Sequence, residues 1–381
     1  MDKTAVFNGC TAEKPQLYSK GREDGSMKIA CLFAGQGAQY PGMGSDLYEK
    51  YEKSREVFDA AGEKIRNLCF NGTAEELKLT ENTQPCVYTV TMAAYEEFIS
   101  RFKERKPQDA KIAAMAGFSL GEYAALTAAG VIPDIETGVE LMEHRGRYMG
   151  EAGRNEAGEN IGTMAAAIGD RAKVLECVEK AREDGILVAA NINAPTQTVV
   201  SGDRDAVARF AQIAKEARLR VTPLAVGSAF HSPMMAPASE KMRSLILTKD
   251  ITPSDFPVYS NLTARPISEY RKGSASEGAP QSDKSDSLAD SADSAADASS
   301  ALPPQTAEDI ADAMALQLMS PVQWVSTIEN LKAAGIDTVI EFGPGKTLCG
   351  LVKKIDKTMK TYNVENAESL ESTLEAICSA E

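Results

Sequence analysis

The chain of 381 residues has only two histidines and one tryptophan, and it contains no apolar run long enough to cross a membrane. Its seven cysteines are scattered and form no C-x-x-C pair, which argues against a disulfide framework or a zinc site. The first residues lack the apolar core of a secretory signal, so we expect a cytoplasmic protein with reduced thiols. A net charge of −14 argues against nucleic acid as a partner.

The most informative segment is Gly-Phe-Ser-Leu-Gly at 117–121, which has the G-x-S-x-G spacing of a nucleophile elbow. Residues 112–116 are apolar and predict a buried strand, and residues 122–129 are strong helix formers without proline. In this setting Ser119 is predicted to be a nucleophile on a sharp strand-to-helix turn, with the amide of Leu120 in its oxyanion hole. The alternative is a structural serine that caps a helix N-terminus between two glycines.

A serine nucleophile needs a base, and only His144 and His231 are candidates. His231 follows the apolar, strand-like run 221–226 and lies in a loop, where active-site side chains are usually displayed. His144 falls within the helical pattern 136–149, on its polar face. We therefore predict that His231 is the general base. The acidic residues are too numerous for spacing to identify a third member.

Three segments outside the elbow define the expected domain organisation, which is of the α/β class. Residues 1–26 are polar and aperiodic, and we predict that they form a flexible extension. Residues 273–304 are rich in Ser, Ala and Asp, and we predict that they form a disordered loop. Residues 158–226 contain the pattern β-α-β-β-α-β, which is the ferredoxin-like order. This small subdomain would be inserted into an α/β-hydrolase-like large domain with a mostly parallel sheet, formed by 27–157 and 227–381.

Two glycine-rich loops resemble nucleotide-binding motifs but do not match them. The loop that follows a predicted strand at 28–34 is not a Rossmann fingerprint, because Tyr40 stands where glycine or alanine is needed. Gly-Lys-Thr at 345–347 is not a Walker A loop, because Ile340 stands at the position of the leading glycine. The other predicted elements of the large domain include helices over 46–58, 85–99 and 307–319 and a strand over 338–342.

Six ordered motifs together carry a resemblance to a known family. They are Gly-Gln-Gly-Ala-Gln at 35–39, Gly-Phe-Ser-Leu-Gly-Glu-Tyr at 117–123, His-Arg-Gly at 144–146, Ala-Phe-His-Ser-Pro at 229–233, Pro-Val-Gln-Trp at 321–324 and Glu-Phe-Gly-Pro-Gly-Lys at 341–346. From about residue 27 to the C-terminus, apart from the serine-rich loop, the chain resembles the malonyl-CoA:acyl carrier protein transacylases of fatty acid synthesis and the acyltransferase domains of polyketide synthases.

The resemblance implies a two-step transfer of malonyl through an ester on Ser119. His231 would act as the base while Ser119 attacks malonyl-CoA, and again while the phosphopantetheine thiol of acyl carrier protein takes the malonyl group. The amides of Gln36 and Leu120 would bind the tetrahedral oxyanions. No metal or other cofactor is expected. We expect a monomer, with no membrane partner, onto which an acidic carrier docks through local lysines and arginines.

Arg145 and Phe230 bear on which acyl group is transferred. Arg145 lies on the apolar face of its predicted helix, where its guanidinium would be buried and would need a polar partner. Malonyl offers a carboxylate that a guanidinium can hold with two parallel hydrogen bonds, and the alternative is an internal salt bridge. In the related acyltransferases a phenylalanine before the histidine accompanies malonyl. The resemblance therefore implies malonyl rather than methylmalonyl, whose α-methyl group Phe230 would crowd.

Phe118 is a departure from the family, because the elbow usually has histidine at this position. Phenylalanine makes the predicted pocket wall less polar than histidine would, so we expect the enzyme to discriminate between acyl donors differently from its relatives. The resemblance also places Gln323 near the base, where a carbonyl rather than a carboxylate would orient the imidazole of His231.

Other functions remain open at this point. A serine hydrolase, such as an acyl-CoA thioesterase or esterase, shares the elbow and the base but uses water as the acceptor. A freestanding polyketide acyltransferase would perform the same chemistry in another pathway. A non-catalytic carrier-binding module would not need Ser119, His231 and Arg145 together, so their presence argues against it.

Overall fold

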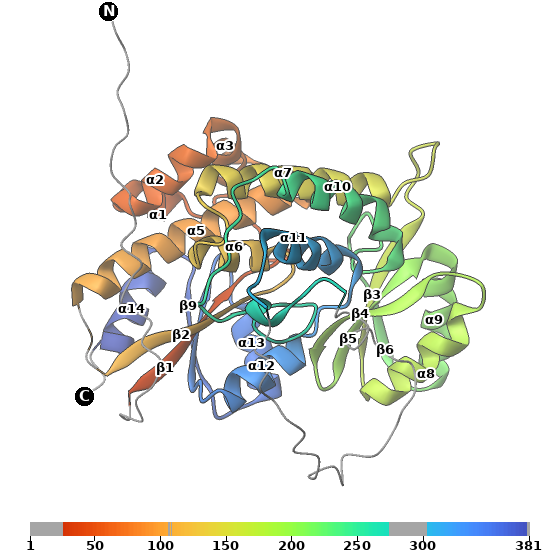
Figure 1. Cartoon of the computed structure of the whole chain (residues 1–381). Coiled ribbons are helices and arrows are strands. Elements are labelled where there is room, and N and C mark those ends of the chain that lie inside the picture. The colour runs from red at the N-terminus through yellow and green to blue at the C-terminus, as the bar shows by residue number, and fades with distance from the viewer. Residues whose placement is uncertain (1–25, 106, 108, 274–302, 379–381) are drawn as a thin grey trace, which may run out of the picture.

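The computed structural model describes residues 26–105, 107, 109–273 and 303–378. Its larger sheet has five strands in the order β7-β2-β1-β8-β9, and every neighbouring pair is parallel (Figure 1). The strands are β1 (Met27–Phe33), β2 (Ala110–Gly117), β7 (Val258–Tyr259), β8 (Thr338–Phe342) and β9 (Lys360–Val364). The predicted α/β class with a mostly parallel sheet is confirmed.

Helices cover both faces of this sheet, as β1 illustrates, because successive side chains of a strand point to opposite faces. Ile29 and Phe33 belong to the core that contains α5 (Thr80–Arg105), whereas Leu32 belongs to the core that contains α12 (Trp324–Ala333). Other helices of this part are α1 (Ser45–Lys50), α2 (Glu52–Ala61), α3 (Glu63–Asn71), α4 (Ala74–Lys78), α6 (Gly121–Ala128), α7 (Ile135–Ala152), α10 (Ala236–Ile246), α11 (Ala307–Leu316), α13 (Thr347–Ile355) and α14 (Ala367–Cys378). Within the described residues, no helix combines the length and apolar character that a membrane crossing requires.

The smaller sheet has four strands in the order β4-β5-β3-β6, and all of its pairs are antiparallel. Its elements are β3 (Gly162–Ile168), α8 (Arg171–Arg182), β4 (Leu187–Ala194), β5 (Gln197–Asp203), α9 (Arg204–Glu216) and β6 (Arg220–Pro223). The two helices pack on one face of this sheet around a separate apolar core, beside the larger sheet (Figure 1). This is the predicted ferredoxin-like arrangement, and the subdomain limits 158–226 stay a prediction.

The helix predicted over 46–58 is in fact two helices, α1 and α2, which meet at Tyr51. The backbone of Tyr51 is extended, with φ of −126°, although the local sequence favours a helix. Its hydroxyl donates to Glu371 of α14 at 3.0 Å, and the Arg101 guanidinium lies 4.5 Å from its ring centroid. The break thus falls at a residue whose side chain is bound by segments distant in the sequence.

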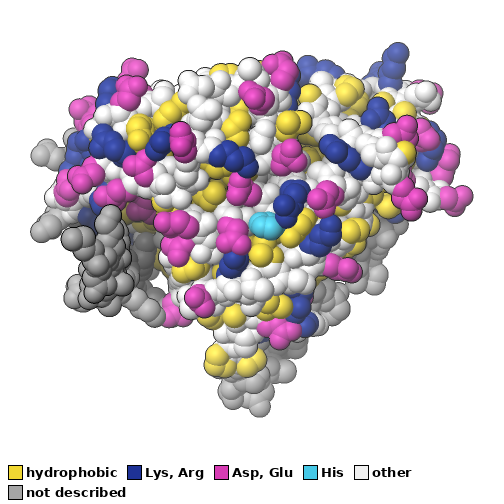
Figure 2. All heavy atoms as spheres, turned by 90° about the horizontal axis from the view of Figure 1, so that it is seen from above, with side chains coloured by type: hydrophobic (Ala, Val, Ile, Leu, Met, Phe, Trp, Pro, Cys, Tyr) yellow, Lys and Arg dark blue, Asp and Glu magenta, His cyan; other side chains and the backbone are white. Residues whose placement is uncertain are grey.

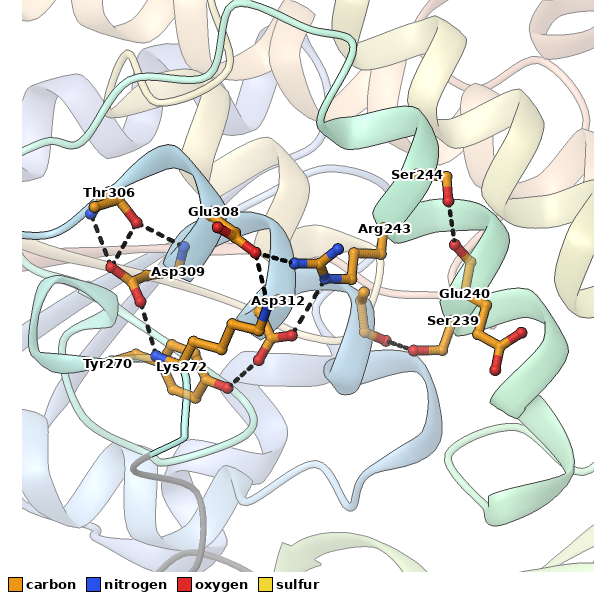
Figure 3. A network of polar contacts seen from close by, with 11 residues as sticks. Ser239, Glu240, Arg243, Ser244, Tyr270, Lys272, Thr306, Glu308, Asp309 and Asp312 are labelled. Atoms are coloured by element: carbon orange, nitrogen blue, oxygen red, sulfur yellow. Dashed lines mark hydrogen bonds and ion pairs between the residues drawn. The ribbon is translucent and has the colours of Figure 1, made fainter.

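A polar network joins the two described ends of the segment that was predicted to be a disordered loop (Figure 3). The Lys272 N–H donates to the Asp309 carboxylate at 2.8 Å, and the Arg243 guanidinium contacts both Glu308 and Asp312 of α11. The Lys272 ammonium also donates to Glu308 at 2.6 Å, so residue 272 is held against α11, and Arg243 ties the same helix to α10. The loop prediction, apart from residues 273, 303 and 304, lies outside the described residues, as does the extension 1–25.

The start of α6 is packed so closely on β1 that Gly121 has no room for a side chain. A Cβ atom there would lie 2.2 Å from the Phe33 carbonyl oxygen, whereas one at Gly350, within α13, would meet nothing within 4 Å. We expect Gly121→Ala to lower the free energy of unfolding by about 1–3 kcal/mol. Gly350→Ala should leave it unchanged or raise it by about 0.5–1 kcal/mol. Urea denaturation measures both, and equal midpoints for the two variants would contradict this packing.

Candidate active site

Ser119 stands between the end of β2 and the start of α6, and its backbone is left-handed, with φ of 54°. This conformation costs a residue other than glycine roughly 1–2 kcal/mol, so its neighbours must hold it in place. The Phe118 N–H donates to the Phe33 carbonyl at 3.0 Å, and Gly121 packs on the same end of β1. The strand, turn and helix of the predicted elbow are therefore present, at the carboxyl edge of the parallel sheet.

The structure brings His231 to Ser119. The Nε2 atom lies 2.8 Å from the serine Oγ, and the ring is buried in the loop before the short helix η1 (Pro233–Met235). Its Nδ1 atom lies 3.1 Å from the carbonyl oxygens of both Gln317 and Ser320. Because a carbonyl can only accept, Nδ1 must carry the proton, which leaves Nε2 free to accept the proton of the serine hydroxyl. His231 thus has the geometry of the base.

His144 is not near the nucleophile. It lies part-exposed on α7, with its Nδ1 atom 3.0 Å from the Tyr148 hydroxyl and 2.8 Å from Arg147 Nη2. The structure thus places His231, and not His144, beside Ser119.

The assignment of Gln323 was wrong. Two backbone carbonyls do orient the imidazole, but they belong to Gln317 and Ser320. Beyond Ser320 the chain pairs with β4 through Val322, and Gln323 then becomes the N-cap of α12. Its N–H donates to the Asn261 carbonyl at 3.1 Å. Among the described residues, no hydrogen bond joins Gln323 to the His231 ring.

Arg145 reaches the nucleophile from α7, and its side chain is buried. Nη1 donates to Gln84 Oε1 at 2.7 Å, and Nη2 donates to Gln317 Oε1 at 2.9 Å and to Ser119 Oγ at 3.2 Å. Among the described residues Arg145 makes no ion pair, and its Nε atom has no hydrogen-bond partner. The internal salt bridge considered from the sequence is therefore absent from the described part of the chain.

Three buried polar residues of the site were not found from the sequence: Glu122, Asn261 and Gln317. Gln317 Nε2 donates to the Ser119 carbonyl at 2.7 Å and to Glu122 Oε2 at 3.1 Å. Glu122 Oε2 also accepts from the Asn261 N–H at 2.8 Å, and burial raises the pKa of this carboxyl. Glu122 lies inside the elbow motif, so a signal existed for it. The other two lie outside every motif and are brought in by the fold.

Comparisons with known proteins place this site in a family. The acyl transferase domain family matches residues 31–373. The malonyl CoA-acyl carrier protein transacylase of Bacillus subtilis strain 168 is 38% identical over 357 residues, which cover 92% of this chain and 97% of that protein. The Escherichia coli K12 protein of the same name is 32% identical, covering 91% and 99%. The chain belongs to the malonyl CoA-acyl carrier protein transacylase family.

Solved structures of transacylases share the fold. The Clostridium perfringens malonyl CoA-acyl carrier protein transacylase superposes with a TM-score of 0.74 at 34% identity, covering 92% of this chain and 97% of that chain. A malonyl-transacylase solved in complex with a type II PKS acyl-carrier protein gives a TM-score of 0.75 at 30% identity, with 92% and 99% covered.

The residues expected to form the oxyanion hole lie in two loops. Gln36 lies in the loop after β1, and Leu120 lies in the turn between β2 and α6. Leu120 is the N-cap of α6, and within the described chain neither its amide nor that of Gln36 has an acceptor. The Ser119 N–H, by contrast, donates to Asn261 Oδ1 at 2.7 Å, so it is not available to an oxyanion. The roles of Gln36 and Leu120 stay predictions that this arrangement permits.

The two phenylalanines of the transacylase motifs belong to different apolar clusters. Phe230 is buried in the core that contains α5. Phe118 packs edge-on against Trp324, with ring centroids 5.3 Å apart. A Cβ atom on Gly35 would lie 2.9 Å from the Phe118 ring, so this ring supports the loop that carries Gln36.

Burial, together with the neighbouring Arg145 cation, lowers the pKa of His231 to about 4. The imidazole is therefore neutral at pH 7 and can accept a proton from Ser119 without first losing one. The site thus places a neutral base, a hydroxyl and a guanidinium around Ser119 Oγ.

Within the described residues no group of three or more His, Cys, Asp or Glu side chains could hold a metal ion.

We expect the reactivity of Ser119 to persist well below pH 6.5, the ordinary pKa of histidine, and to be lost as the pH falls through about 4. The rate at which an uncharged fluorophosphonate labels Ser119 measures this directly, because the probe itself does not titrate. In Arg145→Ala the midpoint should move to higher pH, because a neighbouring positive charge is lost. A wild-type midpoint at or above pH 6.5 would contradict the neutral, buried base.

Proposed function

We propose that this protein transfers malonyl from malonyl-CoA to the phosphopantetheine thiol of acyl carrier protein and so supplies extender units for fatty acid synthesis. The observation that carries the proposal is that a single oxygen, Ser119 Oγ, lies 2.8 Å from His231 Nε2 and 3.2 Å from Arg145 Nη2. A base and a carboxylate-binding group thus converge on the nucleophile. The names of the relatives agree with this chemistry.

In the first half-reaction Nε2 takes the hydroxyl proton while Oγ bonds to the thioester carbon of malonyl-CoA. The resulting oxyanion is stabilised by the amides of Leu120 and Gln36. When the carbon–sulfur bond breaks, the imidazolium returns its proton to the departing CoA sulfur, and malonyl remains as an ester on Ser119. The Gln317 and Ser320 carbonyls, which accept from Nδ1, support the positive charge that His231 carries between these steps.

In the second half-reaction the carrier thiol takes the place of CoA. Nε2 removes the thiol proton, the sulfur attacks the ester carbon, and the same amides bind the second oxyanion. When the ester bond breaks, the proton passes from the imidazolium to Ser119 Oγ. The enzyme returns to its starting state, and no cofactor of its own is needed.

Arg145 supports malonyl as the acyl group. Its present hydrogen-bond partners are neutral oxygens, and among the described residues no carboxylate forms an ion pair with it; the buried Glu122 acts on its charge only from a distance. The malonyl carboxylate would supply that ion pair and could use the unpartnered Nε together with a terminal nitrogen. Phe230, buried beside the base, is proposed to disfavour the branched methylmalonyl group.

Two further features bear on where and with what the enzyme works. We propose a cytoplasmic location, because all six cysteines in the described ranges are free thiols. On the face that lies over α7 and α10, basic and acidic side chains are interspersed among the described residues (Figure 2). That face offers no broad electrostatic fit to an acidic carrier, which agrees with docking through local lysines and arginines.

A second candidate is a freestanding polyketide acyltransferase. It is favoured by the structural likeness to a malonyl-transacylase bound to a type II PKS acyl-carrier protein. The chemistry at Ser119 would be the same, and only the carrier would differ.

Transfer and hydrolysis are distinguished by the acceptor. With malonyl-CoA and phosphopantetheinylated carrier protein, we expect malonyl-carrier to accumulate, as seen by intact mass. With malonyl-CoA alone, CoA release should stop near one equivalent per enzyme. Continuous CoA release without the carrier, and no malonyl-carrier with it, would identify a thioesterase instead. Parallel assays with fatty acid and polyketide carriers compare the two pathways.

The preference for malonyl-CoA over acetyl-CoA as the donor tests whether Arg145 binds the malonyl carboxylate. Arg145→Ala should lower kcat/KM for malonyl-CoA by about 30-fold or more, which corresponds to about 2 kcal/mol of lost charge-assisted contact. Loading from acetyl-CoA should be maintained or improved. Arg145→Lys keeps the charge without the paired hydrogen bonds and should be intermediate. Equal malonyl loading by Arg145→Ala and wild type would remove Arg145 from donor recognition.

A further inference from the structure

Asn261, in the turn after β7, makes two side-chain hydrogen bonds to the nucleophile elbow. Its Oδ1 atom accepts the Ser119 N–H at 2.7 Å, and its Nδ2 atom donates to the Gly117 carbonyl at 2.7 Å. Its own N–H donates to Glu122 Oε2 at 2.8 Å, and its carbonyl accepts from the Gln323 N–H at 3.1 Å. Asn261 is 1% exposed, so these contacts are shielded from water.

The Ser119 N–H and the Gly117 carbonyl together require a carboxamide side chain at position 261. A backbone N–H can only donate and a backbone carbonyl can only accept, so the side chain must present an acceptor and a donor side by side. Asparagine does this, whereas aspartate offers only acceptors when ionised. The bound groups belong to the peptide units on either side of Phe118. Asn261 therefore fixes both peptide planes that lead into Ser119.

This bracing acts at the point where the backbone is strained. Ser119 has φ of 54°, a conformation that persists only where surrounding contacts enforce it. On the other side of the residue, Gln317 Nε2 donates to the Ser119 carbonyl at 2.7 Å. The Glu122 carboxylate accepts from both Asn261 and Gln317, so it ties the two supports together. The N–H and the carbonyl of Ser119 are thus both held by buried carboxamides.

We propose that Asn261 is a positioning residue that holds Ser119 in its reactive, left-handed conformation and occupies the Ser119 N–H. With that amide occupied, the oxyanion is left to the amide of Leu120 and a second donor from the other loop. Among the described residues Arg145 donates to Gln84, Gln317 and Ser119 and not to Asn261, so Asn261 does not bind the donor-recognising guanidinium directly. The proposal rests on the proposed function only in taking Ser119 as the nucleophile.

The test compares Asn261→Asp with the matched variant Asn330→Asp. Asn261→Asp keeps an acceptor for the Ser119 N–H but loses the donor to Gly117. Asn330, on α12, also donates from Nδ2 to a backbone carbonyl, that of Ala264 at 2.8 Å, and it does not touch the elbow. Pre-steady-state malonyl loading should be about 100-fold slower in Asn261→Asp, because a small misplacement of a reacting group has an effect of this size. KM should stay within about twofold, and Asn330→Asp should resemble wild type.

Fluorophosphonate labelling separates this proposal from the proposed function, because it reports the reactivity of Ser119 whatever acyl group the enzyme transfers. Labelling should slow in Asn261→Asp as malonyl loading does, and a second variant, Asn261→Ser, should show the same direction. Near-UV circular dichroism checks that each variant is folded. Loading and labelling within about threefold of wild type in a folded variant would overturn the proposal. Failure of both variants to fold would also overturn it, in favour of a purely structural role.

Discussion

A guanidinium buried without a carboxylate partner among the described residues is the constraint around which the site is arranged. Arg145 is 1% exposed, and its positive charge is met by oxygens of Gln84, Gln317 and Ser119. Together with burial, that charge keeps the imidazole of His231 neutral at pH 7. A charge left in this state favours a ligand that brings its own carboxylate. The basicity of His231 and the proposed recognition of malonyl therefore involve the same side chain.

The site also connects the two sheets. Ser320 offers its carbonyl to His231, and two residues later Val322 pairs with β4 of the smaller sheet, with N···O distances of 2.8 and 3.0 Å. The next residue, Gln323, donates to Asn261, which braces the elbow of the larger sheet. A stretch of four residues thus links the small sheet, the base and the nucleophile. This explains why the residues that align the catalytic pair come from segments far apart in the chain.

That Ser119, His231 and Arg145 share one site could be predicted from the sequence, because each lies in a local pattern. These patterns are an elbow between strand and helix, a histidine in a loop, and an arginine on the apolar face of a helix. Gln317 and Asn261 could not be predicted, because their roles arise from backbone and amide contacts that only the assembled fold creates. The misassigned Gln323 lies six residues beyond Gln317, on the far side of the β-bridge. At the break between α1 and α2, Tyr51 likewise contacts Glu371, 320 residues away, which no local pattern reveals.

The assignment of Ser119 is best decided by the intact mass of the protein after exposure to malonyl-CoA, for wild type and for Ser119→Ala. We expect one malonyl adduct on the wild type, lost on addition of phosphopantetheinylated carrier protein, and none on the variant. The adduct should map to Ser119 after proteolysis. A wild-type protein that gains no adduct, or a Ser119→Ala variant that gains one, would contradict the assignment of Ser119 as the temporary carrier of malonyl.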